Sequence, residues 1–225
     1  MTLRSEEGAF SATNGAALSA ASSDTPSTEE AISTAALNAF AANGFNGASM
    51  RVIANNAGTS LSNLYNYFSS KSDLLARVLL ESNMDLLQSL QTRLAAATAD
   101  DCARLVVAVR TYVLWSAHRQ TAGIVALSEV RYLTGALRKQ VVASRDETER
   151  IFIDTVRSGV ASGEFDTPYP RAAARNIVLL CAAFATWYRP SGARTAEEIA
   201  DEQARLALAM VEARDPHRAI FRVAP

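Results

Sequence analysis

The chain has 225 residues, 49% of them apolar, and its formal net charge of -1 excludes a general attraction to nucleic acid, so any DNA contact must come from locally placed charge. The length allows one or two domains, and the many alanines and leucines, with few alternating runs of β-branched residues, favour an all-α fold. The sequence has no apolar run of about 20 residues and no basic segment leading into an apolar one, so we expect a cytoplasmic protein without a membrane span or signal peptide.

The first 24 residues (1–24) are rich in serine, alanine, threonine and glycine and show no sustained period. We interpret them as a flexible tail. The alternative is a basic arm that follows the minor groove, but Arg4 is its only positive charge and is outnumbered by Glu6, Glu7 and Asp24.

A first helix is predicted between Pro26 and the pair Asn43-Gly44. Ser27 and Glu30 fit a capping box at its start. Its apolar stripe consists of Ile32, Ala35, Ala36, Ala39 and Phe40. We expect this helix to brace the two short helices that follow.

Residues 50–67 have the pattern of a helix-turn-helix. A helix over residues 50–57 has Ser49 as N-cap and ends at Gly58, which accepts a left-handed conformation. Thr59 or Ser60 then caps a second helix over residues 61–67. On that helix Leu64 and Phe68 share the inner face, while small amides and hydroxyls that can bond to base edges occupy the outer face. The alternative is an ordinary helical domain in which two helices happen to meet at a glycine.

Ser70 and Asp73 form a capping-box pattern that opens a long helix to about residue 97. This helix would span on the order of 40 Å, enough to join a head to a separate body. Further helices are predicted over residues 101–119, 122–132, 138–162, 171–188 and 195–214. Gly163 closes the third of these.

The segment from Ile32 to Leu79 resembles the amino-terminal domain of the TetR family of bacterial transcriptional repressors. The matching residues are Ala35-Ala36, Phe40, Asn43-Gly44-Phe45, Ser49-Met50, Ile53-Ala54, Ala57-Gly58, Ser60, Leu64-Tyr65, Tyr67-Phe68, Ser70-Lys71 and Leu74. The resemblance implies a three-helix helix-turn-helix DNA-binding head over residues 25–70. A long helix would join it to an all-helical ligand-binding and dimerisation body over residues 71–225.

Carried over by position, Ser60, Ser62 and Asn63 approach bases or nearby phosphates, and Tyr65 and Tyr67 direct their hydroxyls to the DNA backbone. The expected DNA-contacting set is Ser49, Arg51, Thr59, Ser60, Leu61, Ser62, Asn63, Tyr65, Asn66, Tyr67 and Lys71. Among these, Ser49, Arg51 and Lys71 are expected at phosphates.

The head departs from the family pattern in ways that lower its positive charge. Leu61 stands where a polar or basic residue is frequent, Thr59 stands where valine is usual, and Glu29 and Glu30 stand where a basic residue is common. This balance predicts weak non-specific binding and a shallow salt dependence.

Residues 149–165, 187–190 and 197–201 are similar to the carboxy-terminal domain of TetR relatives that regulate lipid or sterol breakdown, several of which respond to acyl-CoA thioesters. The small and apolar residues of helices 171–188 and 195–214 suit a four-helix homodimer interface. The expected ligand-binding residues are Tyr112, Trp115, His118, Arg119, Phe152 and Trp187, with Arg110 as an alternative to Arg119 for an anionic group. Ordinary core packing is the alternative for each aromatic residue, and a helix cap is the alternative for His118.

These patterns favour a ligand-responsive transcriptional repressor that binds a palindromic double-stranded operator and is released by a small hydrophobic effector, with an acyl-CoA-type metabolite as the candidate class. A helical dimeric adaptor that has lost DNA binding is the alternative. An enzyme is disfavoured, because the sequence has only two histidines and no carboxylate pair joined to a histidine on one helical face. Cys102 and Cys181 lie in helical patterns without metal or redox spacing, so we expect reduced core thiols and no metal or cofactor.

Overall fold

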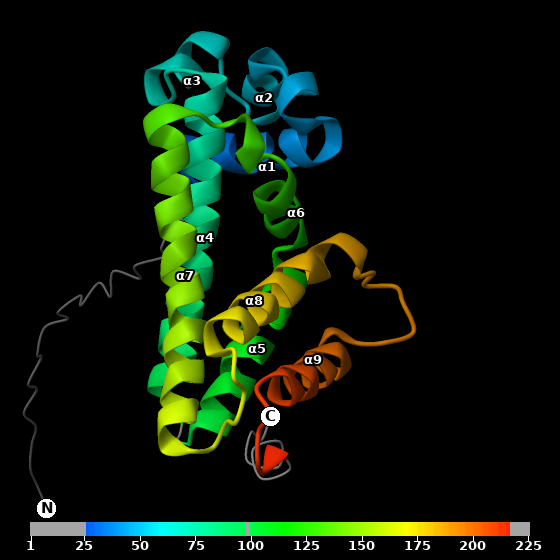
Figure 1. Cartoon of the computed structure of the whole chain (residues 1–225). Coiled ribbons are helices and arrows are strands. Elements are labelled where there is room, and N and C mark those ends of the chain that lie inside the picture. Colours follow the sequence, from blue (N-terminus) through cyan, green and yellow to red (C-terminus); the bar gives the residue numbers. More distant parts are fainter. Residues whose placement is uncertain (1–25, 98–99, 217–225) are drawn as a thin grey trace, which may run out of the picture.

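The computed structural model describes residues 26–97 and 100–216, and these are helical nearly throughout (Figure 1). The helices are α1 (Thr28–Gly47), α2 (Met50–Asn56), α3 (Leu61–Tyr67), α4 (Lys71–Ala95), α5 (Asp101–His118), α6 (Gln120–Ser128), the 3-10 turn η1 (Val130–Tyr132), α7 (Gly135–Ser162), α8 (Pro170–Trp187) and α9 (Ala196–Met210). The predicted all-α fold is confirmed. The proposed tail, residues 1–24, lies outside the described residues.

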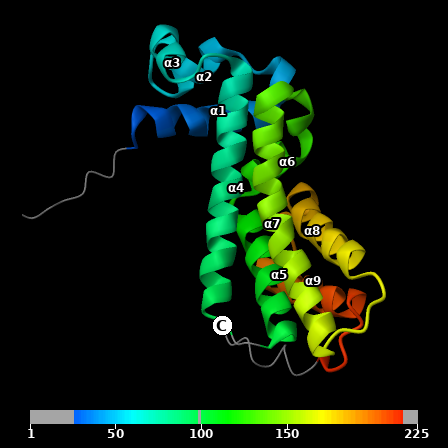
Figure 2. The same ribbon diagram turned by 60° about the vertical axis from the view of Figure 1, so that its left-hand side comes forward.

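The three amino-terminal helices form the head at one end of the molecule, as Figures 1 and 2 both show. The capping box of α1 is present: the Ser27 side chain accepts from the backbone of Glu30, and the Glu30 side chain accepts from the backbone of Ser27. Gly44 breaks α1 with a φ of 66°, which ends its regular part where the sequence predicts. Gly58 has a φ of 68° between α2 and α3, so the predicted helix-turn-helix is confirmed.

Helices α4 and α7 run side by side along the length of the molecule (Figure 2). The Ser70 side chain accepts from the Asp73 backbone, as predicted. In a full capping box the Asp73 carboxylate would also accept a hydrogen bond from the backbone N–H of Ser70. Here it accepts instead from the backbone N–H and the hydroxyl of Ser69.

Three predicted helix boundaries were wrong. Helix α6 ends at Ser128 and residues 130–132 form a separate 3-10 turn, while α7 already begins at Gly135, whose φ is 57°. Helix α9 ends at Met210 and not near residue 214, because Glu212 has a φ of 52° and Ala213 pairs with Phe165 in an isolated bridge.

Buried apolar side chains form two clusters. One fills the body between α4, α5, α7, α8 and α9. The other holds α1, α2, α3 and the start of α4 together and also takes in Val125 of α6, Leu133, and Val141 of α7. The head is therefore seated on α6 and the first turns of α7, and not only on the long helix α4. None of the helices in the described ranges is long and apolar enough to cross a membrane.

Candidate DNA interface and internal cavity

Helix α3 has a buried inner face and a polar outer face. Leu64 is fully buried and Phe68 is 3% exposed, so both fix the helix in the head cluster. The Asn63 amide donates to Thr59 Oγ1 at 2.8 Å, and its oxygen accepts from the Asn66 amide at 3.5 Å. Thr59, Asn63 and Asn66 therefore form a hydrogen-bonded row along one side of the helix.

The other expected DNA-contacting residues surround this row. Ser62, Tyr65 and Tyr67 are exposed on α3, Ser60 caps the helix by accepting from the backbone of Asn63, and Leu61 is half-buried. The structure therefore brings residues 59–67 together on one end of the head.

The positive charges of the head are mostly engaged within the protein. The Lys71 ammonium donates to the Ala48 carbonyl at 3.0 Å and lies 4.7 Å from the centre of the Phe45 ring. Arg77 is paired with Glu29 and Glu81, and burial raises the pKa of Glu81. Arg51 is exposed on α2 and forms no ion pair with any residue of the described ranges.

Ser49 precedes α2 at the N-cap position, but its side chain makes no capping hydrogen bond. The predicted capping bond of Ser49 is therefore absent, and its hydroxyl is not committed to the helix backbone.

A cavity of about 290 Å³ lies in the body among α4, α5, α6, α7 and α8. Its lining is formed by Asn83, Leu86, Tyr112, Trp115, Ser116, Gly123, Ala126, Leu127, Val142, Arg145, Asp146, Thr148, Glu149, Arg175, Val178, Leu179 and Ala182. The buried lining residues are Asn83 and Leu86 on α4, Ser116 on α5, Gly123 on α6 and Thr148 on α7. The exposed lining residues Val142, Asp146, Arg175 and Leu179 belong to α7 and α8, so the mouth lies between these two helices.

The expected ligand residues fall into two groups. Tyr112 and Trp115 line the cavity, and Phe152 lies fully buried behind Tyr112 at a ring distance of 6.3 Å. Phe152 is not part of the lining, and the other three expected residues also lie outside it. His118 is exposed with Nδ1 2.7 Å from the Leu114 carbonyl, Arg119 is paired with Asp85 at 3.2 Å, and Trp187 is 49% exposed at the end of α8.

Sequence reasoning missed the polar residues of the cavity. Arg145 and Thr148 lie on the same stripe of α7 as the buried Val141 and Phe152, at helical spacing. The sequence signal was a charged residue on an otherwise apolar stripe of α7. It was hard to recognise because charged residues occur on every side of this helix. Ser116 likewise continues the buried stripe that contains Val113 on α5.

Two of the cavity's charged groups are paired, and one tyrosine of the lining is partly buried. Arg175 Nε lies 3.1 Å from Glu149 Oε1 at the mouth. Burial raises the pKa of Tyr112, and the nearby Arg145 guanidinium opposes part of that rise. Arg145 therefore brings positive charge to the tyrosine side of the cavity.

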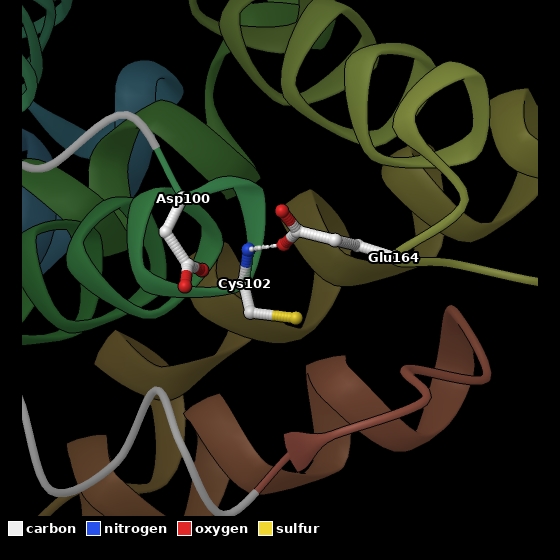
Figure 3. Close-up of side chains that lie close together, drawn as sticks. All are labelled: Asp100, Cys102 and Glu164. Atoms are coloured by element: carbon white, nitrogen blue, oxygen red, sulfur yellow. Dashed lines mark hydrogen bonds between the residues drawn. The ribbon is translucent and has the colours of Figure 1, made fainter.

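Asp100, Cys102 and Glu164 lie close together at the start of α5 (Figure 3), with potential ligand atoms within 4.8 Å of one another. Glu164 accepts from the Cys102 backbone and Asp100 accepts from the Ala103 backbone, both at 2.9 Å. Burial and the hydrogen bond to Glu164 raise the pKa of the Cys102 thiol to about 12, so it stays protonated. The cluster thus caps a helix. Cys102 and Cys181 are both free and buried, as predicted.

The polar-faced helix-turn-helix, held on an all-α body with an internal cavity, defines a DNA-binding regulator. Residues 32–78 match the model described as bacterial regulatory proteins, tetR family, and residues 98–211 match the model described as tetracyclin repressor-like, C-terminal domain. The chain belongs to the TetR family and is a transcriptional regulator, not an enzyme.

Several solved structures share this fold. A tetR-family regulatory protein from Rhodococcus RHA1 aligns with a TM-score of 0.78 and 27% identity over 85% of this chain and 100% of its own. AibR, in complex with isovaleryl coenzyme A and operator DNA, has a TM-score of 0.73 and 22% identity over 83% of this chain and 100% of its own. FadR from Bacillus subtilis, in complex with stearoyl-CoA, has a TM-score of 0.69 and 20% identity over 80% of this chain and 98% of its own. The search of curated proteins gives no match.

Proposed function

We propose that the protein is a homodimeric repressor that binds a palindromic operator and is released by a small hydrophobic effector in the body cavity. The observation that carries this proposal is the outer face of α3, where exposed hydroxyls and amides stand on a helix fixed by Leu64. Asparagine and serine both donate to and accept from base edges in the major groove. The expected DNA-contacting residues Ser49, Arg51 and Lys71 flank this face, where phosphates would lie.

Exposed apolar residues on the last two helices support the homodimer. Trp187 on α8 is 49% exposed, and Leu206 and Met210 on α9 are 45% and 37% exposed. Large apolar side chains gathered on adjacent helices are typical of an interface. A twofold dimer through α8 and α9 would present two heads to two half-sites.

The cavity is the proposed effector site, and an acyl-CoA-type metabolite is the proposed class. Support comes from the mainly apolar lining with a few polar groups, and from the acyl-CoA complexes of AibR and FadR, which share the fold. Release requires that the effector prefer the conformation that does not bind DNA. Helix α6 connects the two sites, because Gly123, Ala126 and Leu127 line the cavity while Val125 is buried in the head cluster.

Replacing Asn63 by alanine tests the recognition surface. The amide offers both a donor and an acceptor to a base edge, so we expect N63A to weaken binding to the DNA flanking the protein's own gene by about 1–3 kcal/mol. Binding to a random duplex should change little. Fluorescence anisotropy with both duplexes measures the difference, and Q88A, which removes an exposed amide from α4, is the matched control.

The repressor proposal fails if the protein, at submicromolar concentration, binds the DNA that flanks its own gene no better than it binds a random duplex. A stable dimer that binds no DNA would favour the alternative of a helical adaptor. The low positive charge of the head is consistent with such a loss of DNA binding.

A further inference from the structure

The Lys71 ammonium is held by uncharged groups at the start of α4. It donates to the Ala48 carbonyl at 3.0 Å and to the Asn46 carbonyl at 3.5 Å, and it lies 4.7 Å from the centre of the Phe45 ring. It forms no ion pair with any carboxylate in the described part of the chain. A cation in the first turn of a helix is disfavoured by the helix dipole, and these contacts offset that cost. The charge of Lys71 is therefore fixed in place but not neutralised.

The Phe45 ring that supports Lys71 is itself held partly by the body. Phe45 follows the break at Gly44, so the regular part of α1 does not fix its side chain. Its ring stacks on Phe40 at a centroid distance of 6.0 Å and on Tyr132 at 5.3 Å, with interplanar angles of 26° and 18°. Phe40 belongs to α1, whereas Tyr132 belongs to η1, where the connection between α6 and α7 meets the head (Figure 1). One of the two rings that hold Phe45 thus comes from the body.

Tyr132 is itself fixed by several contacts. It is half-buried against the head cluster, and the guanidinium carbon of Arg131 lies 5.0 Å from the centre of its ring. Its backbone N–H donates to the Glu129 carbonyl at 3.0 Å, while the Glu129 carboxylate accepts from the Phe45 N–H. Stacked rings and cations over rings both favour a defined geometry. The segment after α6 therefore holds Phe45 by its backbone and by its ring.

We propose that Tyr132 is a positioning residue for DNA binding, which fixes the Phe45 ring and through it the Lys71 ammonium at a phosphate of the operator. This inference rests on the proposed function for the phosphate contact of Lys71. An ammonium has three N–H donors, and the two carbonyls leave one of them for a phosphate oxygen. The body then contributes to operator affinity through a residue that does not touch the DNA.

The chain has only two lysines, so the environment of Lys71 can be measured without DNA. Lys139 is exposed near the start of α7 and serves as the internal reference. Mass spectrometry after brief acetylation gives the ratio of the Lys71 rate to the Lys139 rate. We expect this ratio to be below one in the parent protein and to rise at least threefold in Y132A. Y132F keeps the ring and should retain the parent's ratio.

Anisotropy with the DNA that flanks the gene measures the consequence for binding. Y132A should weaken binding about three- to tenfold and make the slope of log K against log salt shallower by up to about 2, because a dimer loses two phosphate contacts. K71M should show the same change of slope, and the double variant Y132A/K71M should bind as K71M does.

V130A is the matched control. Val130 lies in the same 3-10 turn and packs against the same cluster, but it contributes no ring to the stack. Its labelling ratio and salt slope should equal those of the parent protein. Circular dichroism verifies that each variant is folded.

Three results would overturn the inference: a labelling ratio in Y132A equal to the parent's, the same rise of that ratio in V130A as in Y132A, or losses of DNA binding in Y132A and K71M that add fully in the double variant. Labelling uses no DNA. A parent protein that does not bind its flanking DNA would contradict the proposed function, while the labelling ratio would still decide whether Tyr132 fixes Lys71.

Discussion

Replacing Leu64 by alanine is expected to abolish operator binding and to lower the free energy of unfolding by about 2–5 kcal/mol. Leu64 is fully buried in the head cluster, and α3 has only seven residues. A helix this short has little stability of its own and depends on tertiary packing. The loss of one apolar anchor therefore removes both packing energy and the alignment of the polar face.

Urea unfolding followed by circular dichroism measures the stability of L64A, and anisotropy measures its DNA binding. V52A is the control, because Val52 is 50% exposed on the neighbouring helix α2 and should change stability by less than about 0.5 kcal/mol. Retention of operator binding by L64A would show that the packing of α3 does not position the DNA-contacting residues.

The second large effect is expected at Glu129, which joins the body to the head. This residue follows α6, is 5% exposed, and accepts a hydrogen bond from the Phe45 backbone at 2.6 Å. Phe45 comes directly after the break at Gly44, so its N–H needs a partner outside the regular helix. The Glu129 carboxylate supplies that partner from a segment that begins in the cavity wall.

E129A should lower the free energy of unfolding by about 1–3 kcal/mol, because it leaves the Phe45 N–H without its acceptor. It should also reduce the effector's influence on operator affinity by about fivefold or more, since the head loses its hydrogen bond to the segment that follows α6. E129Q retains an acceptor and should behave like the parent protein.

Operator titrations with and without effector measure this coupling in all three proteins. If E129A and E129Q respond to effector equally and as strongly as the parent protein, the Glu129 contact does not transmit the signal.

The head was predictable from sequence because its determinants are local. Capping residues such as Ser27, the glycine at position 58 and the i,i+4 pair of Leu64 and Phe68 each act over less than two helical turns. Their structural roles are confirmed, whereas the DNA contacts expected of residues 49–71 stay predictions.

The cavity was less predictable because it depends on how five helices meet. Tyr112 and Trp115 were found through their aromatic character, while Ser116, Arg145 and Thr148 were not, since polar residues on charged helices usually face solvent. The hydrogen bond between the Phe45 N–H and the Glu129 carboxylate joins residues 84 positions apart, and no local sequence pattern indicates it.

The most direct test of the account is the salt dependence of DNA binding. If the outer face of α3 reads the operator mainly through uncharged groups, few counterions are released when the protein binds. If Arg51 and Lys71 of each head both contact phosphates, as proposed, a dimer should show a slope of log K against log salt of about −4. Anisotropy between about 50 and 200 mM salt, with flanking DNA and a random duplex, measures it. We expect this shallow slope together with a clear preference for the DNA that flanks the gene. A slope near −8 or steeper with equal affinity for both duplexes would contradict it.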